Sequence, residues 1–459
     1  MIINVRFLAM KFVEAAFASD EAAQRGSGEV EKLSPEDRRL FHEISFGVLR
    51  EWGFLLQVIA AKAKRQPKGR GRTLLVLAAY QLLFLDRVPG YAIFSETKKI
   101  GELLLLSEPE TKFIHAILKT IEREKTEILK QRADALSRLQ EGHPPESDFE
   151  WGVLNASPAL VDALSVVDSE MRRKDARPRA VQALAAMRAR PLLVGYAMPG
   201  ETPSTPYPAL GSTIAPRALE LESGDGLQAD LASGAVRVQG EASQWACEWA
   251  AELLEKRAQS SGSKIRVLEM ATGKGGKLLG TLAAWSALRK TELPAIEWVA
   301  VDSSSAQLQL LETDAVPLVR KKWPQVSLQI QRLSWAQGAA IEAVGDFGPF
   351  DLVWLDAPCT GFGTLAKLPQ IAMVRGEAAY EEAKRGALLQ TSLCEAGLGL
   401  KAKGGALFYT VCTMTRPETY DVVEFCQKSL GATLERMQSI WPGAAPAPRA
   451  EGFFAALMK

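Results

Sequence analysis

The sequence predicts a multidomain protein in which an all-α N-terminal domain precedes an α/β domain with an open, largely parallel sheet. Apolar residues in about the first 140 positions recur at helical spacing, with few strand signals. From about residue 245 onward, apolar strands, glycine-rich turns and helices alternate, which is typical of open α/β sheets. The 459 residues allow roughly three domains.

The N-terminal domain shows clear helix boundaries. Ser34 is followed by Pro35 and two acidic residues, the pattern of a capped helix start. An almost wholly apolar stretch at 73–85 predicts a central helix, and two further helices are expected at 93–106 and 110–125. The N-terminal part is therefore expected to be a helical bundle.

The rest of the chain divides into two further parts. Connections containing Pro and Gly surround one or two helices before residue 245, and the alternating α/β pattern follows. The predicted domains are 1–140, 141–245 and 246–459. The predicted strands of the last domain are 265–269, 298–302, 328–331, 352–356 and 406–411, and its predicted helices are 277–288, 305–311 and 380–398.

Composition excludes several classes of protein. Five cysteines without CxxC spacing are too few for a disulfide scaffold and make a structural zinc site unexpected, so no metal is predicted. The three histidines, His42, His115 and His143, all lie in the first third of the chain. A Ser-His-Asp or Cys-His pair within the C-terminal two thirds is therefore excluded.

Targeting signals are not evident in the sequence. The first eleven residues have apolar stretches that are too short for a signal peptide and are interrupted by charge. The longest apolar run, 74–85, is too short to span a membrane. We therefore expect a cytoplasmic monomer that contacts no membrane.

A basic segment at 62–72 holds six cations and no acid. A solvated helix end and loop is the commoner explanation of such a run, and composition alone favours it. The other interpretation is a strip that contacts nucleic-acid phosphates, although a net charge of +1 excludes a uniformly basic surface. The candidate RNA-binding residues of this segment are Lys62, Lys64, Arg65, Lys68, Arg70 and Arg72.

The first strand of the α/β domain ends in a glycine-rich turn, VLEMATGKGGK, that leads into a helix. Backbone N–H groups at such a helix start can approach a ligand closely. The turn lacks both ends of a Walker A loop, so triphosphate binding is disfavoured. Asp302 at the end of the second strand is placed to accept hydrogen bonds from ribose hydroxyls, which indicates a nucleoside-containing cofactor. Capping of the next helix is the alternative role for Asp302.

Two cysteines follow neighbouring strands of the predicted sheet. Asp356 and Cys359 come at the end of one strand, and Cys412 comes at the end of the next. Buried cysteines are usually small core residues, and this explanation suits Cys247, Cys394 and Cys426. Two thiols at strand ends beside a carboxylate instead indicate a nucleophilic site.

These motifs resemble those of the ribosomal-RNA cytosine-5 methyltransferases of the Sun/RsmB type, relatives of the nucleolar NOL/NOP proteins. The glycine-rich turn is similar to the family's VLDACAAPGGK, LDAPCTGFGTL to its DAPCSGxGT motif, and LFYTVCTMTRPET to its YSTCSxxPEE segment. Upstream, VQGEASQ resembles the family's VQDEASQ, and EGFFA at the end resembles DGFFxA. The N-terminal helices, with LAAYQLLFLDRVP, resemble the family's NusB-like RNA-binding domain.

The resemblance implies a Rossmann-like domain that uses S-adenosylmethionine to methylate carbon 5 of cytosine in RNA, with 16S ribosomal RNA as the expected substrate. Cys412 would add to carbon 6 of the base, Asp356 would hydrogen-bond its N3 edge, and Cys359 would assist proton removal and product release. Lys277 would orient cofactor or base. The cofactor-binding residues implied are Glu269, Ala271, Gly273, Gly275, Gly276, Lys277, Asp302 and Asp356.

The sequence departs from the family at several positions. Residues 366–370 replace a pair of arginines, so that Lys367 supplies only a point charge toward RNA. Residues 332–335 replace the third-strand acid, and Trp335 there either stacks on adenine or packs in the core. Two alternatives stay open: an inactive RNA-binding ribosome-assembly factor that keeps the fold, and a methyltransferase acting on DNA or protein.

Overall fold

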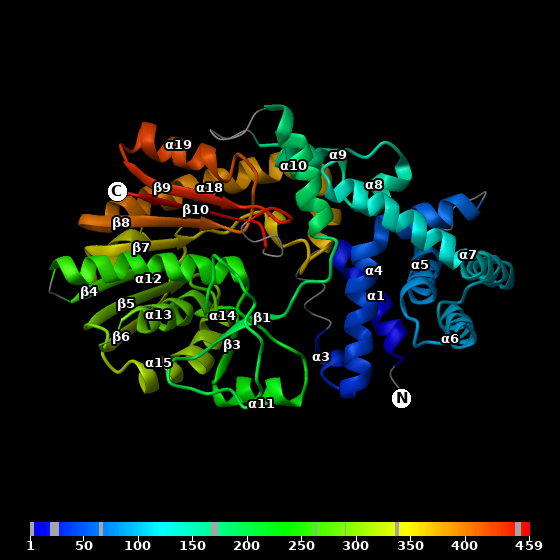
Figure 1. Cartoon of the computed structure of the whole chain (residues 1–459), viewed down its shortest axis with the longest axis horizontal. Helices are drawn as coiled ribbons and strands as arrows, with labels where there is room; N and C mark the ends of the chain where they lie inside the picture. The colour runs from blue at the N-terminus through cyan, green and yellow to red at the C-terminus, as the bar shows by residue number, and fades with distance from the viewer. Residues whose placement is uncertain are drawn as a thin grey trace. The chain divides into compact units, whose positions relative to one another are not determined.

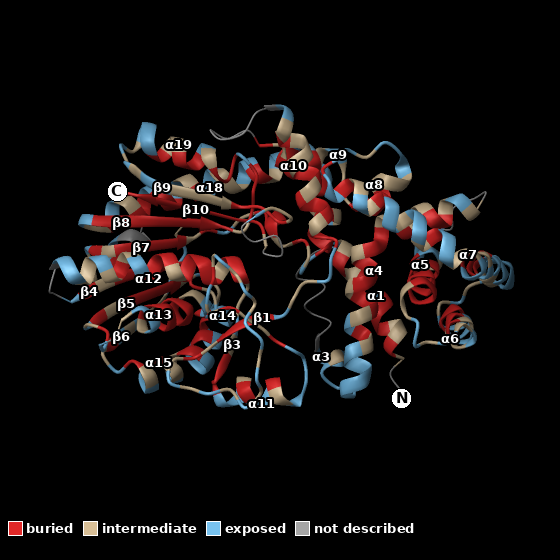
Figure 2. Cartoon of the chain, viewed as in Figure 1, coloured by how far each residue is buried: buried red, intermediate tan, exposed pale blue. Residues whose placement is uncertain are grey.

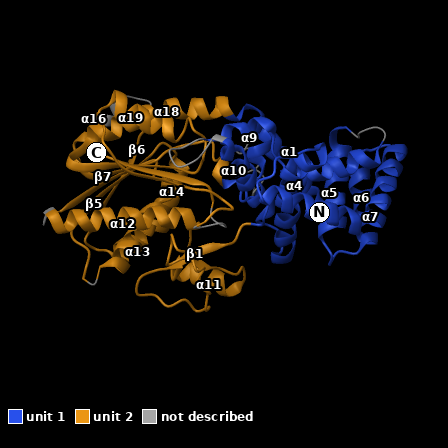
Figure 3. Cartoon of the chain, turned by 45° about the horizontal axis from the view of Figure 1, so that its top comes forward, with its two compact units in different colours: residues 1–190, 364–379 blue, residues 191–363, 380–459 orange. Residues whose placement is uncertain are grey.

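A computed structural model describes residues 4–18, 27–63, 68–166, 173–261, 264–289, 291–335, 339–445 and 451–459. The chain separates into two compact units, shown in different colours in Figure 3. Unit 1 contains residues 1–190 together with 364–379, and unit 2 contains residues 191–363 and 380–459. The later segment 364–379 thus belongs to the same unit as the N-terminal helices. The predicted division at residues 140 and 245 stays a prediction.

Unit 1 is helical (Figure 1). Its longest helices are α4 (Pro35–Lys62) and α7 (Glu108–Gln140). The others are α1 (Val5–Ala18), α3 (Ser27–Val30), α5 (Gly69–Phe84), α6 (Gly90–Leu103), α8 (Asp148–Leu154), α9 (Pro158–Leu164), α10 (Arg173–Ala186), α17 (Gln370–Arg375) and the 3₁₀ turn η3 (Gly376–Ala378).

Local sequence explains where the long helices begin. The Ser34 hydroxyl accepts a hydrogen bond from the Asp37 N–H at 3.1 Å, as predicted for the start of α4. Ser107 and Glu110 form a reciprocal capping box at the start of α7. Of the described helices, α4 alone is long and apolar enough to cross a membrane. Within the protein, 61% of its apolar stretch is buried.

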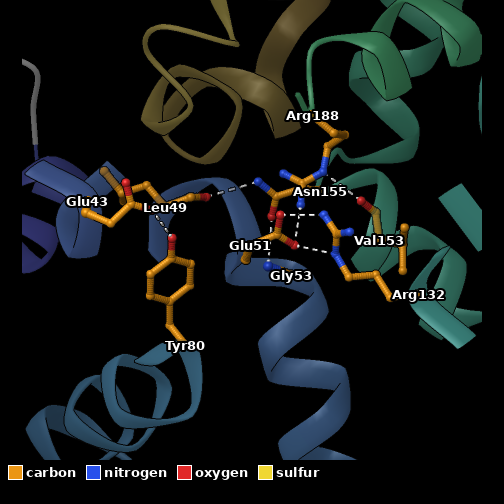
Figure 4. A network of polar contacts seen from close by, with 9 residues as sticks. All are labelled: Glu43, Leu49, Glu51, Gly53, Tyr80, Arg132, Val153, Asn155 and Arg188. Atoms are coloured by element: carbon orange, nitrogen blue, oxygen red, sulfur yellow. Dashed lines mark hydrogen bonds and ion pairs between the residues drawn. The ribbon is translucent and has the colours of Figure 1, made fainter. Parts of the chain in front are cut away.

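A buried ionic network joins the helices of unit 1 (Figure 4). Glu51 on α4 accepts two hydrogen bonds from Arg132 on α7, at 2.9 and 2.6 Å, and a third from Arg188 at 2.9 Å. The Asn155 side chain hydrogen-bonds both the Leu49 carbonyl and the Gly53 N–H, at 3.1 and 2.7 Å. One buried carboxylate and one amide therefore tie α4 to α7, to α8 and to the chain after α10.

Unit 2 is built on a seven-stranded sheet of order β6-β5-β4-β7-β8-β10-β9. Its strands are β4 (Ile265–Met270), β5 (Ile296–Asp302), β6 (Val326–Arg332), β7 (Phe350–Asp356), β8 (Lys401–Val411), β9 (Leu434–Ile440) and β10 (Phe453–Met458). The first five strands in this order are parallel to one another, and β10 runs antiparallel to both β8 and β9. The mostly parallel sheet predicted from the alternating pattern is confirmed.

Helices cover both faces of this sheet, and the side chains of each strand alternate between two cores. Trp298, Trp354 and Phe408 lie in one core with α12 (Glu241–Ser261) and α13 (Gly276–Leu288). Val299, Val353 and Leu407, each a neighbour of those residues in the chain, lie in the other core with α18 (Ala379–Leu400) and α19 (Tyr420–Ser429). Figure 2 shows the inner strands buried, whereas the edge strands β6 and β9 are partly exposed.

The remaining elements of unit 2 are short. A three-stranded sheet of order β2-β1-β3 precedes the large sheet. The short elements are β1 (Val194–Ala197), β2 (Leu219–Glu220), α11 (Asp225–Ser233), β3 (Val236–Val238), α14 (Ser305–Leu310), the π-turn η1 (Leu311–Ala315), α15 (Val316–Lys322), α16 (Ala339–Gly345) and the 3₁₀ turn η2 (Phe362–Thr364).

All five predicted strands of the α/β domain are present, each extended by one to five residues. The three predicted helices of this domain match α13, α14 and α18 within two residues at each end. Strand β9 was not predicted, because its sequence LERMQSI is only half-buried and lacks a continuous apolar run.

Candidate active site

The order of the parallel strands determines where the functional side chains meet. Strands β4, β7 and β8 are adjacent, and β5 flanks β4 on its other side. Because parallel strands end at the same edge of a sheet, the glycine-rich turn, Asp302, Asp356 and the two cysteines all follow strand ends at one edge. The predicted convergence of these motifs is therefore present in the structure.

The turn after β4 is held in an unusual backbone conformation. Ala271, Gly273 and Gly275 all have positive φ, at 59°, 57° and 80°. The Gly273 N–H donates a hydrogen bond of 2.8 Å to one carboxylate oxygen of Asp302, and the Ser304 N–H donates one of 2.8 Å to the other. Asp302 thus fixes the turn, while Ser304 and not Asp302 is the N-cap of α14.

This turn leaves its backbone open to a ligand. A Cβ atom placed on Gly273 or Gly276 would meet nothing within 4 Å. The Thr272 hydroxyl interacts with the buried carboxyl group of Glu269. An open backbone at a helix start, beside the Asp302 carboxylate at the end of the next strand, fits a cofactor with an amino-acid and a nucleoside part, as S-adenosylmethionine has.

Glu269 is a buried carboxyl group on β4. Its side chain is 1% exposed, and Oε2 accepts a hydrogen bond of 3.0 Å from the Trp298 indole N–H. Burial raises the pKa of Glu269 to about 7, and the hydrogen bonds from Trp298 and Thr272 lower it only in part. This carboxyl group therefore titrates near neutral pH, whereas an ordinary surface glutamate is fully ionised there.

Asp356 and Lys277 form an ion pair at the strand ends. The Lys277 ammonium contacts Asp356 Oδ2, and the Thr410 hydroxyl donates a 2.9 Å hydrogen bond to Oδ1. Thr410 in turn accepts a hydrogen bond of 3.1 Å from the Trp354 indole N–H. Burial acts to lower the pKa of Lys277, but Asp356 outweighs it and the pKa is raised. Lys277 is thus a permanent cation that holds the Asp356 carboxylate in one orientation.

The two strand-end cysteines are in contact. The Sγ atoms of Cys359 and Cys412 lie 3.3 Å apart, and both residues are partly exposed. The hydrogen bond to Cys412 and burial raise the pKa of Cys359 well above its ordinary value. Cys247, Cys394 and Cys426 are fully buried, which agrees with the core role predicted for them.

Backbone packing at the cysteine loops requires glycine. The Gly363 N–H donates a hydrogen bond of 3.0 Å to the Cys412 carbonyl, and the Gly452 N–H donates one of 2.9 Å to the Gly363 carbonyl. A Cβ atom on Gly363 would lie 1.9 Å from the Gly452 oxygen, so no side chain fits there. This close approach explains the second glycine of the GFGT sequence.

Two residues that the sequence analysis did not single out belong to this site. Thr410 orients Asp356, as described above. Glu418, fully buried after Cys412, accepts hydrogen bonds from Thr360, the residue next to Cys359. The signal for Glu418 was available as an acid inside the TRPET segment, but nothing in the chain's periodicity shows that it reaches a loop 58 residues away.

The candidate RNA-binding residues lie in unit 1, as far as the structure describes them. Lys62 at the end of α4 pairs with Glu124. Lys68, Arg70 and Arg72 are exposed around the start of α5, and Arg70 Nε lies 3.8 Å from Glu14. Lys64 and Arg65 lie outside the described residues. Lys367 is exposed on the segment 364–379, which also belongs to unit 1.

Trp335, after β6, packs against the core that contains Val299 and Val301, and its indole N–H is buried without a partner. Core packing is thus present, and the unpaired N–H leaves the adenine interpretation open to test. Among the described residues, no group of three or more His, Cys, Asp or Glu could hold a metal ion.

Comparison with known proteins agrees with this two-part architecture. Residues 3–123 match the NusB family, and residues 262–458 match the family of 16S rRNA methyltransferase RsmB/F. The chain is 26% identical over 441 residues to ribosomal RNA small subunit methyltransferase B of Serratia proteamaculans, covering 92% of this chain and 90% of that protein. The protein of the same name from Pseudomonas putida is 26% identical over 449 residues, covering 94% and 90%.

Among solved structures, the crystal structure of PH0851 superposes with a TM-score of 0.64 at 17% identity. The superposition covers 100% of this chain and 99% of that one. The similarity shows that the two chains share a fold.

Proposed function

The chain joins a NusB-family domain to a methyltransferase domain of the RsmB/F family, and on this premise we propose that it methylates carbon 5 of a cytosine in 16S ribosomal RNA. The coarser activity, S-adenosylmethionine-dependent methylation of ribosomal RNA, follows from the family. The contact between Cys359 and Cys412 beside the Lys277–Asp356 pair carries the finer proposal.

Cysteine chemistry is needed because carbon 5 of cytosine is a poor nucleophile until a group adds to carbon 6. The Cys412 thiolate adds to carbon 6 in our proposal, which places a negative charge on the ring. The Lys277 ammonium, which interacts electrostatically with Cys412, supplies a positive charge near the reacting groups. When bound, S-adenosylmethionine supplies the methyl group that carbon 5 then takes.

Asp356 and Cys359 complete the proposed reaction. Each Asp356 oxygen already accepts one hydrogen bond and has a lone pair left, which accepts a hydrogen bond from the N3 edge of the cytosine once N3 carries a proton. Cys359 assists removal of the carbon 5 proton and the release of Cys412 from the product. Since no histidine lies beyond residue 143, the two thiols and Asp356 are the groups available for these proton transfers.

Methyl transfer tests the proposal directly. Labelled S-adenosylmethionine and ribosomal RNA from a strain that lacks this gene should yield 5-methylcytosine, at a position that base-resolved mapping identifies. Absence of transfer to any RNA would favour the alternative, an inactive RNA-binding assembly factor. A product methylated on DNA or protein would contradict the proposed substrate.

The division of roles between the cysteines makes a separate prediction. Cys359→Ala should accumulate a covalent protein–RNA adduct, because Cys412 still adds to the base but release is blocked. Cys412→Ala should form no adduct and transfer no methyl group. Denaturing gel electrophoresis with labelled RNA measures both outcomes, and equal behaviour of the two variants would overturn the assignment.

A further inference from the structure

Glu418 is a carboxylate buried between the two cysteine loops. Its side chain is 0% exposed, and its hydrogen-bond donors are the backbone and hydroxyl of Thr360, the amide of Gln390 and the hydroxyl of Thr415. Oε1 accepts from the Thr360 N–H at 2.8 Å and from the Gln390 amide at 3.2 Å. Oε2 accepts from the hydroxyls of Thr360 and Thr415, at 2.6 and 2.8 Å. A buried charge in such a setting is stable only because every lone pair is used.

The donors to Glu418 come from both cysteine loops. Thr360 is bonded directly to Cys359, whereas Thr415 follows Cys412 by three residues. The hydroxyls of Thr360 and Thr413 also lie 3.0 Å apart. Gln390, on α18, donates a second bond of 2.9 Å to the Pro358 carbonyl, immediately before Cys359. One carboxylate therefore connects the residues that flank each sulfur atom.

Helix α18 is shaped to admit this carboxylate. A Cβ atom on Gly386 would lie 2.6 Å from Glu418 Oε1, so a side chain at this position would collide with it. Glycine inside a helix costs about 1 kcal/mol relative to alanine. Gly386 thus lowers the stability of the helix at the point where Glu418 approaches it.

We propose that Glu418 is a positioning residue, whose two oxygens clamp the Cys359 loop to the Cys412 loop and whose charge makes the two thiols unequal. This inference rests on the proposed cysteine mechanism and deepens it, since it explains why Cys412 and not Cys359 is the nucleophile.

The charged groups around the two cysteines also make the thiols unequal. The titratable groups that face Cys359 are Cys412, Glu418 and the phenol of Tyr409, and each is neutral or negative. The Lys277 ammonium, by contrast, interacts electrostatically with Cys412. A negative neighbour favours the thiol form of Cys359, whereas Cys412 has a cation nearby. Cys359 can therefore donate its proton to the Cys412 sulfur as that sulfur leaves carbon 6, and the Cys359 thiolate that results can accept the proton from carbon 5.

Thiol alkylation of the RNA-free protein tests the charge. Iodoacetamide reacts with thiolates, and peptide-resolved mass spectrometry separates Cys359 from Cys412, while the three buried cysteines stay unreactive. In Glu418→Gln, Oε1 still accepts two N–H bonds and the threonine hydroxyls can rotate to accept from the new amide. The clamp is thus kept and the charge removed. The midpoint pH for alkylation of Cys359 should fall by on the order of one unit.

Kinetics tests the clamp. Glu418→Ala removes both clamp and charge, so kcat should fall about 100-fold, as misplaced reacting groups do. Glu418→Gln should lose about tenfold, and both variants should bind S-adenosylmethionine as the unmodified protein does. Glu255→Gln, a partly buried carboxylate of the same unit outside the site, should leave kcat unchanged.

The alkylation and kinetic experiments test different parts of the proposal. An unchanged Cys359 midpoint in Glu418→Gln would overturn the role of the charge, and an unchanged kcat in Glu418→Ala would overturn the clamp. If the unmodified protein transfers no methyl group to RNA, the proposed function fails, but the alkylation result still decides what Glu418 does to Cys359.

Discussion

Two glutamates of unit 2 show how burial and neighbouring charges together set the pKa of one residue type. Glu269 and Glu255 each accept a hydrogen bond from a tryptophan N–H, Trp298 at 3.0 Å and Trp285 at 2.7 Å. Burial raises the pKa of Glu269 to about 7 from an ordinary 4.5. Burial also acts to raise the pKa of Glu255, but Trp285 and Arg289 outweigh it and the pKa is lowered. The difference is the neighbouring cation, which Glu269 lacks at hydrogen-bond distance.

Glu269→Gln should therefore remove a pH dependence of folding stability. Because the folded-state pKa of Glu269 is raised, its contribution is fully present below pH 4.5 and is lost as pH rises from 4.5 to about 7. The loss is on the order of 3 kcal/mol. Denaturation midpoints between pH 5 and 8 should decline less steeply in the variant than in the unmodified protein.

Glu255→Gln is the matched control, with the opposite sign. Its stability contribution is present above pH 4.5 and lost as pH falls, so this variant should be destabilised at pH 7 by about 1 kcal/mol. Parallel pH curves for Glu269→Gln and the unmodified protein would contradict the assignment of a raised pKa to Glu269.

At the scale of elements, helix α18 serves both the core and the cysteine loops. Leu393 and Cys394 pack against the sheet, while Gly386 and Gln390 meet Glu418 one turn apart. Gly399, in the last turn of the same helix, is exposed, and a Cβ atom there would meet nothing within 4 Å. Two glycines of one helix are therefore present for different reasons.

Alanine substitution at Gly386 and at Gly399 should distinguish the glycine needed for the approach of Glu418 from the glycine that contacts nothing. Gly399→Ala should raise stability by about 0.5–1 kcal/mol, through the helix propensity of alanine, with unchanged methyl transfer. Gly386→Ala gains the same propensity but displaces Glu418, so its methyl transfer should fall about tenfold or more. Thermal melting and initial rates measure both, and full activity of Gly386→Ala would show that Glu418 tolerates displacement.

At the scale of the whole molecule, the near-neutral net charge of +1 conceals a separation of roles. Cations gather around the start of α5 in unit 1, whereas the cysteines and the glycine-rich turn lie in unit 2. We expect unit 1 to supply affinity for RNA phosphates and unit 2 to carry the chemistry. Affinity that comes from phosphate contacts weakens with salt, because bound counterions are released.

Replacing Lys68, Arg70 and Arg72 with alanine should weaken RNA binding and leave the affinity for S-adenosylmethionine unchanged. The slope of log affinity against log salt should decrease by about 2, since each lost contact removes about 0.7. Filter binding between 50 and 200 mM salt gives the slope.

A control triple variant on α7, with Lys112, Arg123 and Lys130 replaced by alanine, removes the same charge from exposed positions of unit 1. Its salt slope should match that of the unmodified protein. Equal slopes for the two triple variants would mean that the α5 cations act only through the net charge.

Local sequence patterns predict the two kinds of domain, the parallel strands and the strand-end positions of Asp302, Asp356, Cys359 and Cys412. These features follow from local periodicity and from the rule that ligands gather at the ends of parallel strands. The contact of Glu418 with Thr360, the orientation of Asp356 by Thr410 and the place of residues 364–379 in unit 1 are visible only in the folded chain. Those contacts join residues 54 or more positions apart, and which side chains meet across such separations depends on packing that no local pattern encodes.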